Sequence, residues 1–394
     1  MRRRAMVRRL AALGAMAVLV GVAAVGQGQA SAATNTPLDC DGVVAVTGGY
    51  RLTHDSICGP FRMTGNDEFF DLGGHTLTGS FRAQGDREVL RNGTLIQSAE
   101  SSAEFTDGFT LSHVTLRVAV VSPPKPSIWL EAGSNFTVMH SKFVDIPGIA
   151  LDFYFNTGGS IRRSSFTGNG YAISIQKSND VVIQDNRFVD NQRGVNLRDE
   201  DGVGVNGNTI LHNTFRGNDY GVYVEVRDTG FVSTAVSNNT IRRNRFVNNG
   251  YSGIRITDTC EGPVQAVVCT SSAGNLIADN IFSGNGLRTP ERLPDNDGVT
   301  ARAYLAGNGT DLLSYPAGLA GFTLTHNRAD HNADLGFDVL GVVDGGRNVA
   351  NGNGNSSQCD GLACRTRHGR EPGATDGLSR AGLLVALGTT YSHH

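Results

Sequence analysis

Hydrophobic and polar positions recur in a fixed order along the middle of this chain. An aliphatic residue is followed by Asn, then by Phe, then by a second Asn, with the same spacing each time. The full copies are Ile183/Asn186/Phe188/Asn191, Ile210/Asn213/Phe215/Asn218, Ile241/Asn244/Phe246/Asn249 and Ile277/Asn280/Phe282/Asn285, and the weaker copies are Val138/Ser141/Phe143, Ile161/Ser164/Phe166/Asn169 and Leu324/Asn327/Ala329/Asn332. A repeat of roughly 20–40 residues without a helical period indicates a solenoid, in which stacked repeats bury a core together.

Each repeat contains short runs in which apolar and polar residues alternate, separated by Asn and Gly. Alternation with a period of two indicates half-buried strands, and Asn and Gly tolerate the left-handed backbone angles of turns. We therefore predict an all-β fold, a single-stranded right-handed parallel β-helix with three parallel sheets. The recurring Phe residues should stack inside it, and the recurring Asn residues should form ladders that satisfy backbone groups of the turns.

The two ends of the chain lack the repeat. Residues 1–32 resemble a secretory signal peptide, with several Arg residues, an apolar run and a small-residue site that predicts cleavage near Ala32. We expect an N-terminal cap over residues 33–64, the β-helix over 65–364 and an irregular tail over 365–394. The mature chain has no apolar run long enough to span a membrane.

Composition narrows the class of protein further. The net charge is −3 with both signs mixed, which gives no indication of nucleic-acid binding. Six cysteines form three couples that are close in sequence, which favours disulfides in an exported protein although other pairings are possible. The expected couples are Cys40 with Cys58, Cys260 with Cys269, and Cys359 with Cys364.

Two segments near the start of the repeats carry a family resemblance. They are Asp71-Leu-Gly-Gly-His-Thr-Leu-Thr-Gly79 and Arg91-Asn-Gly-Thr94, followed by the Asn-x-Phe repeats. Together they resemble the secreted bacterial right-handed β-helix repeat proteins of the pectate-lyase-like superfamily. The resemblance implies the fold but no single reaction, because this scaffold carries lyases, hydrolases, epimerases and adhesins without activity.

The length of the repeat indicates where a site should lie. Successive repeats lengthen toward the C-terminus, and the added residues follow the same strand each time. These insertions are Asp199–Asn206, Arg227–Val236, Asp258–Ala273 and Gly286–Leu319. Insertions on one side of a solenoid commonly form a binding wall, so we expect a groove beside this strand.

The residues expected to face outward along the groove are mostly polar, charged and aromatic, and they come in pairs two residues apart on each strand, such as Trp129 with Glu131, Ala150 with Asp152, and Ser174 with Gln176. Rings stack on sugars, and Arg or Lys binds carboxylates, so the groove suits an acidic polysaccharide. For substrate binding we expect Trp129, Tyr154, Tyr223, Arg227 and Arg255.

The favoured reaction is β-elimination from a uronic acid. Lys177 is the expected base, because Lys loses its proton more readily than Arg, and Arg198 lies one repeat away. A Lys and an Arg on neighbouring repeats resemble the pair used by β-helix lyases that cleave alginate and dermatan-type chains. Oxygen ligands for Ca²⁺ could come from Glu131, Asp152 and Glu225.

Two alternatives remain open. Asp199, Glu200, Asp201 and Glu225 could support glycoside hydrolysis, although the four motifs of the β-helix galacturonidases are missing. The groove could also bind a polysaccharide without catalysis. The sequence therefore predicts a secreted, monomeric protein that acts on an extracellular acidic polysaccharide, with lyase activity favoured.

Overall fold

The computed structural model describes residues 40–119, 127–199, 204–228, 236–261, 272–288, 296–307, 311–314, 316–366 and 369–370. The predicted signal peptide and almost all of the predicted C-terminal tail lie outside these ranges. Within the described ranges no helix is long and apolar enough to cross a membrane. The helical element that is present there is the short 3-10 helix η1 (Pro316–Gly321).

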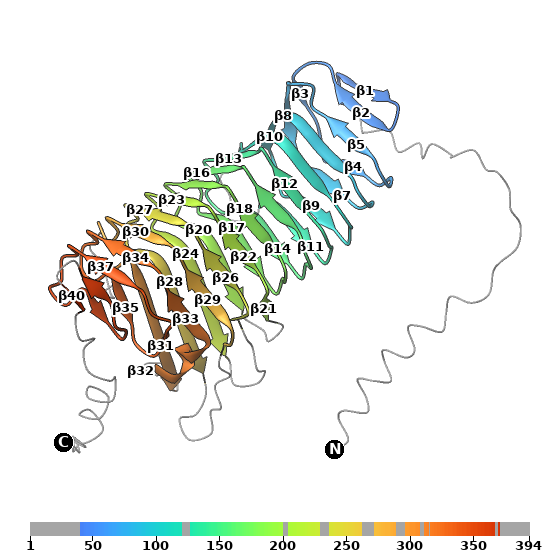
Figure 1. The fold of residues 1–394 in the computed structure, drawn as a ribbon. Helices are drawn as coiled ribbons and strands as arrows, with labels where there is room; N and C mark the ends of the chain where they lie inside the picture. The colour runs from blue at the N-terminus through green and yellow to red at the C-terminus, as the bar shows by residue number, and fades with distance from the viewer. Residues whose placement is uncertain are drawn as a thin grey trace, which may run out of the picture. The chain divides into compact units, whose positions relative to one another are not determined.

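The chain winds as a right-handed parallel β-helix with three sheets, which confirms the predicted fold class (Figure 1). The first sheet contains β2 (Gly49–Leu52), β5 (Phe69–Asp71), β12 (Thr137–Met139), β15 (Ser160–Arg162), β18 (Val182–Gln184), β22 (Thr209–Leu211), β26 (Thr240–Arg242), β29 (Asn275–Ala278), β33 (Phe322–Thr325) and β36 (Val343–Asp344). The second contains β3 (Ser56–Ile57), β6 (Thr76–Gly79), β13 (Lys142–Val144), β16 (Ser165–Thr167), β19 (Arg187–Val189), β23 (Thr214–Arg216), β27 (Arg245–Val247), β30 (Ile281–Ser283), β34 (Arg328–Asp330), β37 (Val349–Asn351) and β39 (Arg365–Thr366). Two long strands, β8 (Val89–Gln97) and β10 (Thr110–Val118), continue around the corner and join these two sheets.

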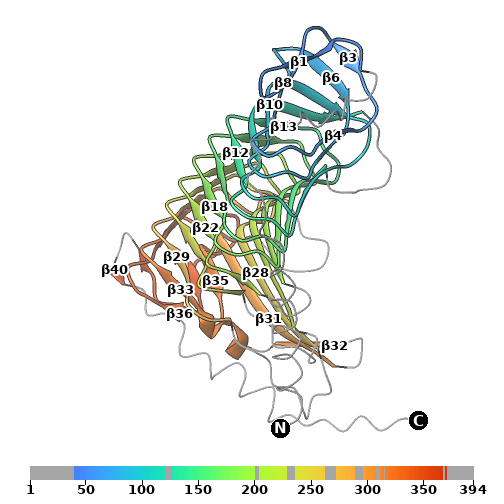
Figure 2. The same ribbon diagram turned by 90° about the vertical axis from the view of Figure 1, so that its right-hand side faces the viewer.

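The third sheet forms the remaining side of each rung. It contains β4 (Phe61–Met63), β7 (Phe81–Ala83), β9 (Ser101–Glu104), β11 (Ile128–Glu131), β14 (Ile149–Tyr154), β17 (Tyr171–Gln176), β20 (Arg193–Asp199), β24 (Tyr220–Asp228), β28 (Ser252–Glu261), β31 (Val299–Gly307), β35 (Phe337–Val339) and β38 (Cys359–Asp360). Figure 2 shows these rungs following one another along the helix.

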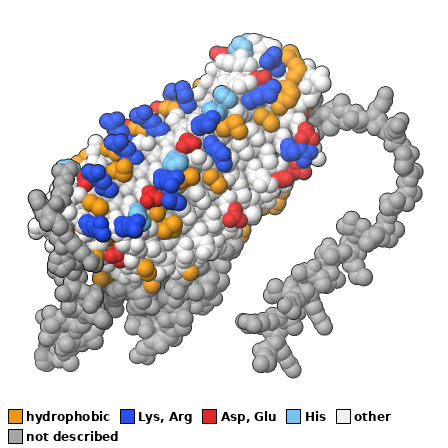
Figure 3. Space-filling model, in the orientation of Figure 1, with side chains coloured by type: hydrophobic (Ala, Val, Ile, Leu, Met, Phe, Trp, Pro, Cys, Tyr) orange, Lys and Arg blue, Asp and Glu red, His pale blue; other side chains and the backbone are white. Residues whose placement is uncertain are grey.

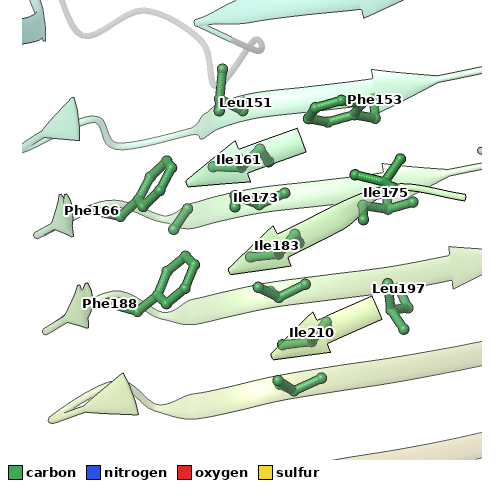
Figure 4. Packing of buried hydrophobic residues seen from close by; sticks show 14 of the residues in the cluster. Leu151, Phe153, Ile161, Phe166, Ile173, Ile175, Ile183, Phe188, Leu197 and Ile210 are labelled. Carbon is green, nitrogen blue, oxygen red and sulfur yellow. The ribbon is translucent and has the colours of Figure 1, made fainter. Parts of the chain in front are cut away.

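A dry core fills the space between the sheets because one residue in two on each strand points inward. Leu151, Ile173 and Ile183 are fully buried and come from successive strands of two sheets (Figure 4). The predicted Phe stack is confirmed: neighbouring rings lie 4.6 to 5.0 Å apart at interplanar angles of 6 to 10°. Its members are Phe143, Phe166, Phe188, Phe215, Phe246 and Phe282.

The two predicted Asn ladders are confirmed as well. Nδ2 of Asn213 donates to the carbonyl of Ile183 at 2.8 Å, and its Oδ1 accepts the backbone N–H of Asn186 at 2.8 Å. Asn213 thus satisfies two turn groups of the preceding rung, which would otherwise be buried without partners. The columns are Asn186, Asn213, Asn244, Asn280, Asn327 and Asn348, and Asn169, Asn191, Asn218, Asn249, Asn285, Asn332 and Asn353.

The ladder Asn residues of the first column do not hold the left-handed backbone angles that we expected of them. The residue before each of them does, as at Asp185 (φ 57°) and His212 (φ 54°). That residue is exposed at the corner, whereas the Asn side chain must turn inward to reach the neighbouring rungs. A third ladder, which the sequence analysis missed, connects Asn208, Asn239 and Asn275.

Both ends of the helix carry antiparallel pairs. At the N-terminal end β1 (Val43–Val46) pairs with β2, and at the C-terminal end β39 pairs with β40 (Gly369–Arg370). Disulfides Cys40–Cys58 and Cys359–Cys364 are present as predicted, whereas Cys269 of the third expected pair lies outside the described residues. Parallel pairing already begins with β2, β3 and β4, ahead of the expected start at residue 65.

Candidate functional site

The outward side chains of the third sheet from β11 to β28 form two columns, which we call the polar strip. In each column, every residue lies beside the corresponding residue of the next strand. Neighbouring strands are about 4.8 Å apart. The first column is Trp129, Asp152, Ser174, Asn196, Tyr223 and Arg255, and the second is Glu131, Tyr154, Gln176, Arg198, Glu225 and Thr257.

The strand register corrects the prediction of which residues of β14 face outward. We expected Ala150 and Asp152 to be the outward pair on their strand, but Ala150 is fully buried. Asp152 lies beside Trp129, and Tyr154 lies beside Glu131. The aromatic rings of Trp129 and Tyr154 consequently meet edge to face, with centroids 6.0 Å apart.

Lys177 lies just beyond the end of β17, in a left-handed conformation (φ 51°) that turns its side chain toward the previous rung. Its Nζ donates to Oη of Tyr154 at 2.9 Å. It also lies 4.8 Å from the ring centroids of Tyr154 and Phe155. The expected base is therefore part of a Lys–Tyr pair, and only 7% of Lys177 is exposed.

Asp152 is the most strongly perturbed acid of the strip. Burial raises the pKa of its carboxyl group to about 6, and hydrogen bonds from Gln176 and Ser174 and the charge of Arg198 oppose that rise. Nε2 of Gln176 lies 3.0 and 3.2 Å from the two carboxylate oxygens of Asp152. A carboxyl group with this pKa exchanges its proton close to neutral pH.

Arg198 lies two strands from Asp152 and contacts Glu225, with 3.7 Å between Nε and Oε2. Arg193, which the sequence analysis missed, lies 3.2 Å from the same Glu225 oxygen and over the ring of Tyr223 at 3.9 Å. Arg193 begins its strand, at a position taken by Tyr171 and Tyr220 on the neighbouring rungs. Because the residue type at this position is not repeated from rung to rung, the sequence pattern gave no indication of Arg193 as a site residue.

The other expected substrate-binding residues differ in accessibility. Trp129, Tyr154 and Tyr223 are half-buried, whereas Arg255 is only 2% exposed and donates from Nε to Oγ1 of Thr257 at 3.2 Å. The backbone of Arg227 lies in β24, but its side chain is outside the described part of the structure.

The three carboxylates expected to hold Ca²⁺ do not converge. Glu131 and Asp152 lie in different columns, and Glu225 lies three strands from Asp152, where it contacts Arg193 and Arg198. Across the described residues no three His, Cys, Asp or Glu side chains are grouped as metal ligands.

Of the acidic residues considered for hydrolysis, Asp199 is fully buried, and Glu225 contacts Arg193 and Arg198. Glu200 and Asp201 lie outside the described residues. An acid pair that the sequence analysis missed lies farther along the same sheet. Burial, and then the neighbouring charge of Asp338, raises the pKa of Asp297 to about 7.

The described parts of the first three insertions follow β20, β24 and β28 at the same end of the third sheet, as expected. The fourth, Gly286–Leu319, does not: it begins after β30 and contains the third-sheet strand β31 together with its antiparallel partner β32 (Asp311–Ser314). After the first two insertions, β21 (Val205–Asn206) and β25 (Val236–Ser237) pair with each other. Nearly half of the inserted residues lie outside the described ranges.

Solved structures similar to this chain are β-helix proteins. The A-module of mannuronan C-5 epimerase AlgE4 from Azotobacter vinelandii is 12% identical with a TM-score of 0.50, and the match covers 76% of this chain and 86% of that one. Alginate lyase AlyF-OU02, in complex with G6, is 13% identical with a TM-score of 0.49, covering 77% of this chain and 80% of that one. At such identities the likeness establishes the fold alone.

No curated protein matches the sequence. A family model described as periplasmic copper-binding protein (NosD) matches residues 81–290, which include the rungs from β7 to β30 and hence the polar strip. Because this match spans more than half of the chain, the protein belongs to the NosD family.

Proposed function

We propose that the polar strip binds an acidic polysaccharide and cleaves it by β-elimination. The observation that carries this proposal is the 2.9 Å hydrogen bond between Lys177 and Tyr154, on a sheet face that also holds Arg198. This arrangement combines two groups able to move protons with a cation able to neutralise a uronate.

The strip contains aromatic and cationic side chains among its polar residues, a combination that suits a sugar chain. Trp129, Tyr154 and Tyr223 offer half-buried rings against which sugar faces can pack. Arg198 offers a planar group that recognises a carboxylate. The strand spacing of about 4.8 Å is similar to the advance of one sugar in an extended chain, so successive rungs can contact successive sugars.

The elimination requires a base for the proton beside the carboxylate and an acid for the leaving oxygen. In the proposed reaction the neutral amine of Lys177 takes the carbon-bound proton, and the Tyr154 hydroxyl donates its proton to the glycosidic oxygen. The bond from that oxygen to the ring carbon breaks, and a carbon–carbon double bond forms. A proton then passes from Lys177 to Tyr154 along their hydrogen bond and restores both groups.

Arg198 and Asp152 have supporting roles in this proposal. The positive charge of Arg198 stabilises the negative charge that develops on the uronate as the proton leaves. Asp152 has a pKa of about 6, so below that pH it is neutral and can donate a hydrogen bond to an anionic sugar. Above that pH its charge opposes the uronate, so binding should weaken.

The test is the ultraviolet absorbance of the unsaturated uronate, after incubation with polygalacturonate, alginate and glycosaminoglycans. Lys177→Met keeps the packing against the rings of Tyr154 and Phe155 but removes the amine, and should lower the rate by roughly 100-fold or more. Tyr154→Phe should lower it comparably. Arg62→Ala, which removes an exposed cation from the same sheet, is the matched control and should leave the rate unchanged.

Elimination that survives Lys177→Met would show that the base is another group. Binding of a polymer without any rise in absorbance would favour the alternative, a carbohydrate-binding β-helix without catalysis. The Ca²⁺ prediction is tested in the same assay, by comparing the rate with added Ca²⁺ and with a chelator.

The family description names copper, and the described residues do not fit a copper site. Copper prefers imidazole and sulfur ligands. The rings of His113 and His140 stack face to face, 4.8 Å apart, and Nδ1 of His113 already contacts Ser112 at 2.7 Å. Cys40, Cys58, Cys359 and Cys364 are in disulfides, so no reaction step is assigned to copper.

Export from the cytoplasm fits this proposal. The two described disulfides are typical of an oxidising compartment, and the family description is periplasmic. The predicted signal peptide, with cleavage near Ala32, supports secretion or residence in the periplasm and can be tested by sequencing the N-terminus of the exported protein.

A further inference from the structure

A second charged surface lies away from the polar strip, on the first and second sheets and on the corner between them. We call it the basic face; Figure 3 shows Lys and Arg side chains distributed along it, with His between them. The exposed cations on it include Lys142, Arg162, Arg163, Arg187, Arg216, Arg245 and Arg328.

One column of this face has a regular arrangement. The first residues of the second-sheet strands from β13 to β39 lie in register, and every second one is a cation. The order is Lys142, Ser165, Arg187, Thr214, Arg245, Ile281, Arg328, Val349 and Arg365. We call this column the cation row. Its charges repeat every two rungs, or about 10 Å.

Most charges of the row are not neutralised within the described part of the protein. Lys142, Arg187 and Arg245 form no ion pair there, whereas Arg328 contacts Asp330 on its own strand. Other corners of the face do contain pairs, such as Arg242 with Asp279 at 2.7 Å. The row therefore keeps positive charge that neighbouring acidic residues could have cancelled, in a protein whose net charge is −3.

A depression lies beside the start of the row. Its volume is about 330 Å³, and its lining includes His140, Lys142, Arg163 and Arg187, with Asp185 as the single carboxylate. Ser165, also in the lining, lies between Lys142 and Arg187 in the row and adds a hydroxyl group. Such a hollow can hold an anionic group together with part of the ring that bears it.

We propose that the cation row holds a linear acidic polysaccharide, laid along the helix axis with an anionic group of every second sugar at each cation. An extended β-linked chain repeats every two sugars, over a distance similar to the spacing of the row. Four of the five cations are Arg, which binds carboxylates and sulfates through two parallel hydrogen bonds. The row would hold the polymer on a side of the protein away from the strip, whether or not the strip is catalytic.

Other polyanions fit the row less well. Duplex DNA carries about one charge per 1.7 Å, far denser than one cation per about 10 Å. A membrane surface is favoured by apolar side chains next to dense basic clusters. The row carries one cation every two rungs rather than a dense cluster, and its first three cations are separated by Ser165 and Thr214 and its last three by Ile281 and Val349.

The experiment compares two triple variants in a Lys177→Met background, which prevents cleavage. The row variant is Lys142→Ser, Arg187→Ser and Arg245→Ser. The matched variant, Arg117→Ser, Arg162→Ser and Arg216→Ser, removes the same charge from exposed positions of the same face outside the row. Binding to polygalacturonate and alginate fragments of increasing length is measured by calorimetry, with dextran as the uncharged control.

The row variant should bind long fragments roughly tenfold or more weakly, and the matched variant should lose clearly less. Affinity in the parent protein should rise with fragment length until the fragment spans the row. Equal losses in both variants, no binding of either polymer, or tighter binding to single-stranded DNA or to phosphatidylglycerol vesicles would overturn the proposal. Binding to the row is measured in the Lys177→Met background and does not depend on elimination. Either proposal can therefore fail while the other stands.

Discussion

At the scale of single residues, burial changes the chemistry of acids whose positions in the sequence look ordinary. Glu88 is fully buried at a turn of an early rung. Burial raises the pKa of its carboxyl group from 4.5 to about 8, with the N–H groups of Gly85 and Gln84 opposing and Glu68 adding to the rise. The native protein therefore keeps Glu88 protonated at neutral pH.

This pKa predicts a pH dependence of stability. Because the folded pKa lies above the unfolded one, the stabilising contribution is fully present below about pH 4.5 and is lost as pH rises toward 8. Glu88→Gln cannot ionise, so the variant should gain a few kcal/mol relative to the parent between pH 5 and pH 8. Denaturant unfolding at several pH values measures this difference.

Glu68→Gln tests the coupling between the two turns, because Glu68 lies at the equivalent turn one rung earlier and its charge adds to the rise at Glu88. Removing that charge should lower the pKa of Glu88 and weaken the pH dependence of stability. A Glu88→Gln difference that is constant from pH 5 to pH 8 would contradict the protonated state of Glu88.

At the scale of elements, the Asn ladders tie each turn to the next rung. Asn213→Leu should destabilise the protein by about 1–3 kcal/mol, because the carbonyl of Ile183 and the backbone N–H of Asn186 lose their partner. Chemical denaturation measures the change. His212→Asn alters the neighbouring exposed residue, which keeps a left-handed angle that Asn tolerates, and should be nearly neutral. Equal effects of the two substitutions would mean that the ladder adds little to stability.

The ladders and the Phe stack could be predicted because each column repeats one residue type at a fixed offset in the sequence. The third ladder could have been predicted in the same way, because Asn208, Asn239 and Asn275 each lie two residues before the aliphatic residue of their repeat. The contact between Lys177 and Tyr154 depends on strand register and on a left-handed residue after β17, and neither is visible in the sequence. Asp152 was assigned to the wrong column because counting residues could not show that Ala150 turns inward.

At the scale of the whole β-helix, stability should be distributed along the chain. Each rung contacts chiefly its two neighbours through parallel ladders, so the ends can open while the middle stays folded. The N-terminal end is closed by the antiparallel pair of β1 and β2 and by the Cys40–Cys58 disulfide. The middle contains the uninterrupted Phe stack and the ladders.

Replacing both Cys40 and Cys58 by Ser therefore tests whether the rungs are coupled locally or across the whole helix. The disulfide closes a loop with a sequence separation of 18, and such a crosslink contributes about 3 kcal/mol. Hydrogen exchange should lose protection in β2 to β4, whereas β19 to β27 should keep theirs, because several rungs separate them from the change. A uniform loss of protection along the chain would instead mean that the β-helix unfolds as one cooperative unit, and the cap would then stabilise the polar strip as well.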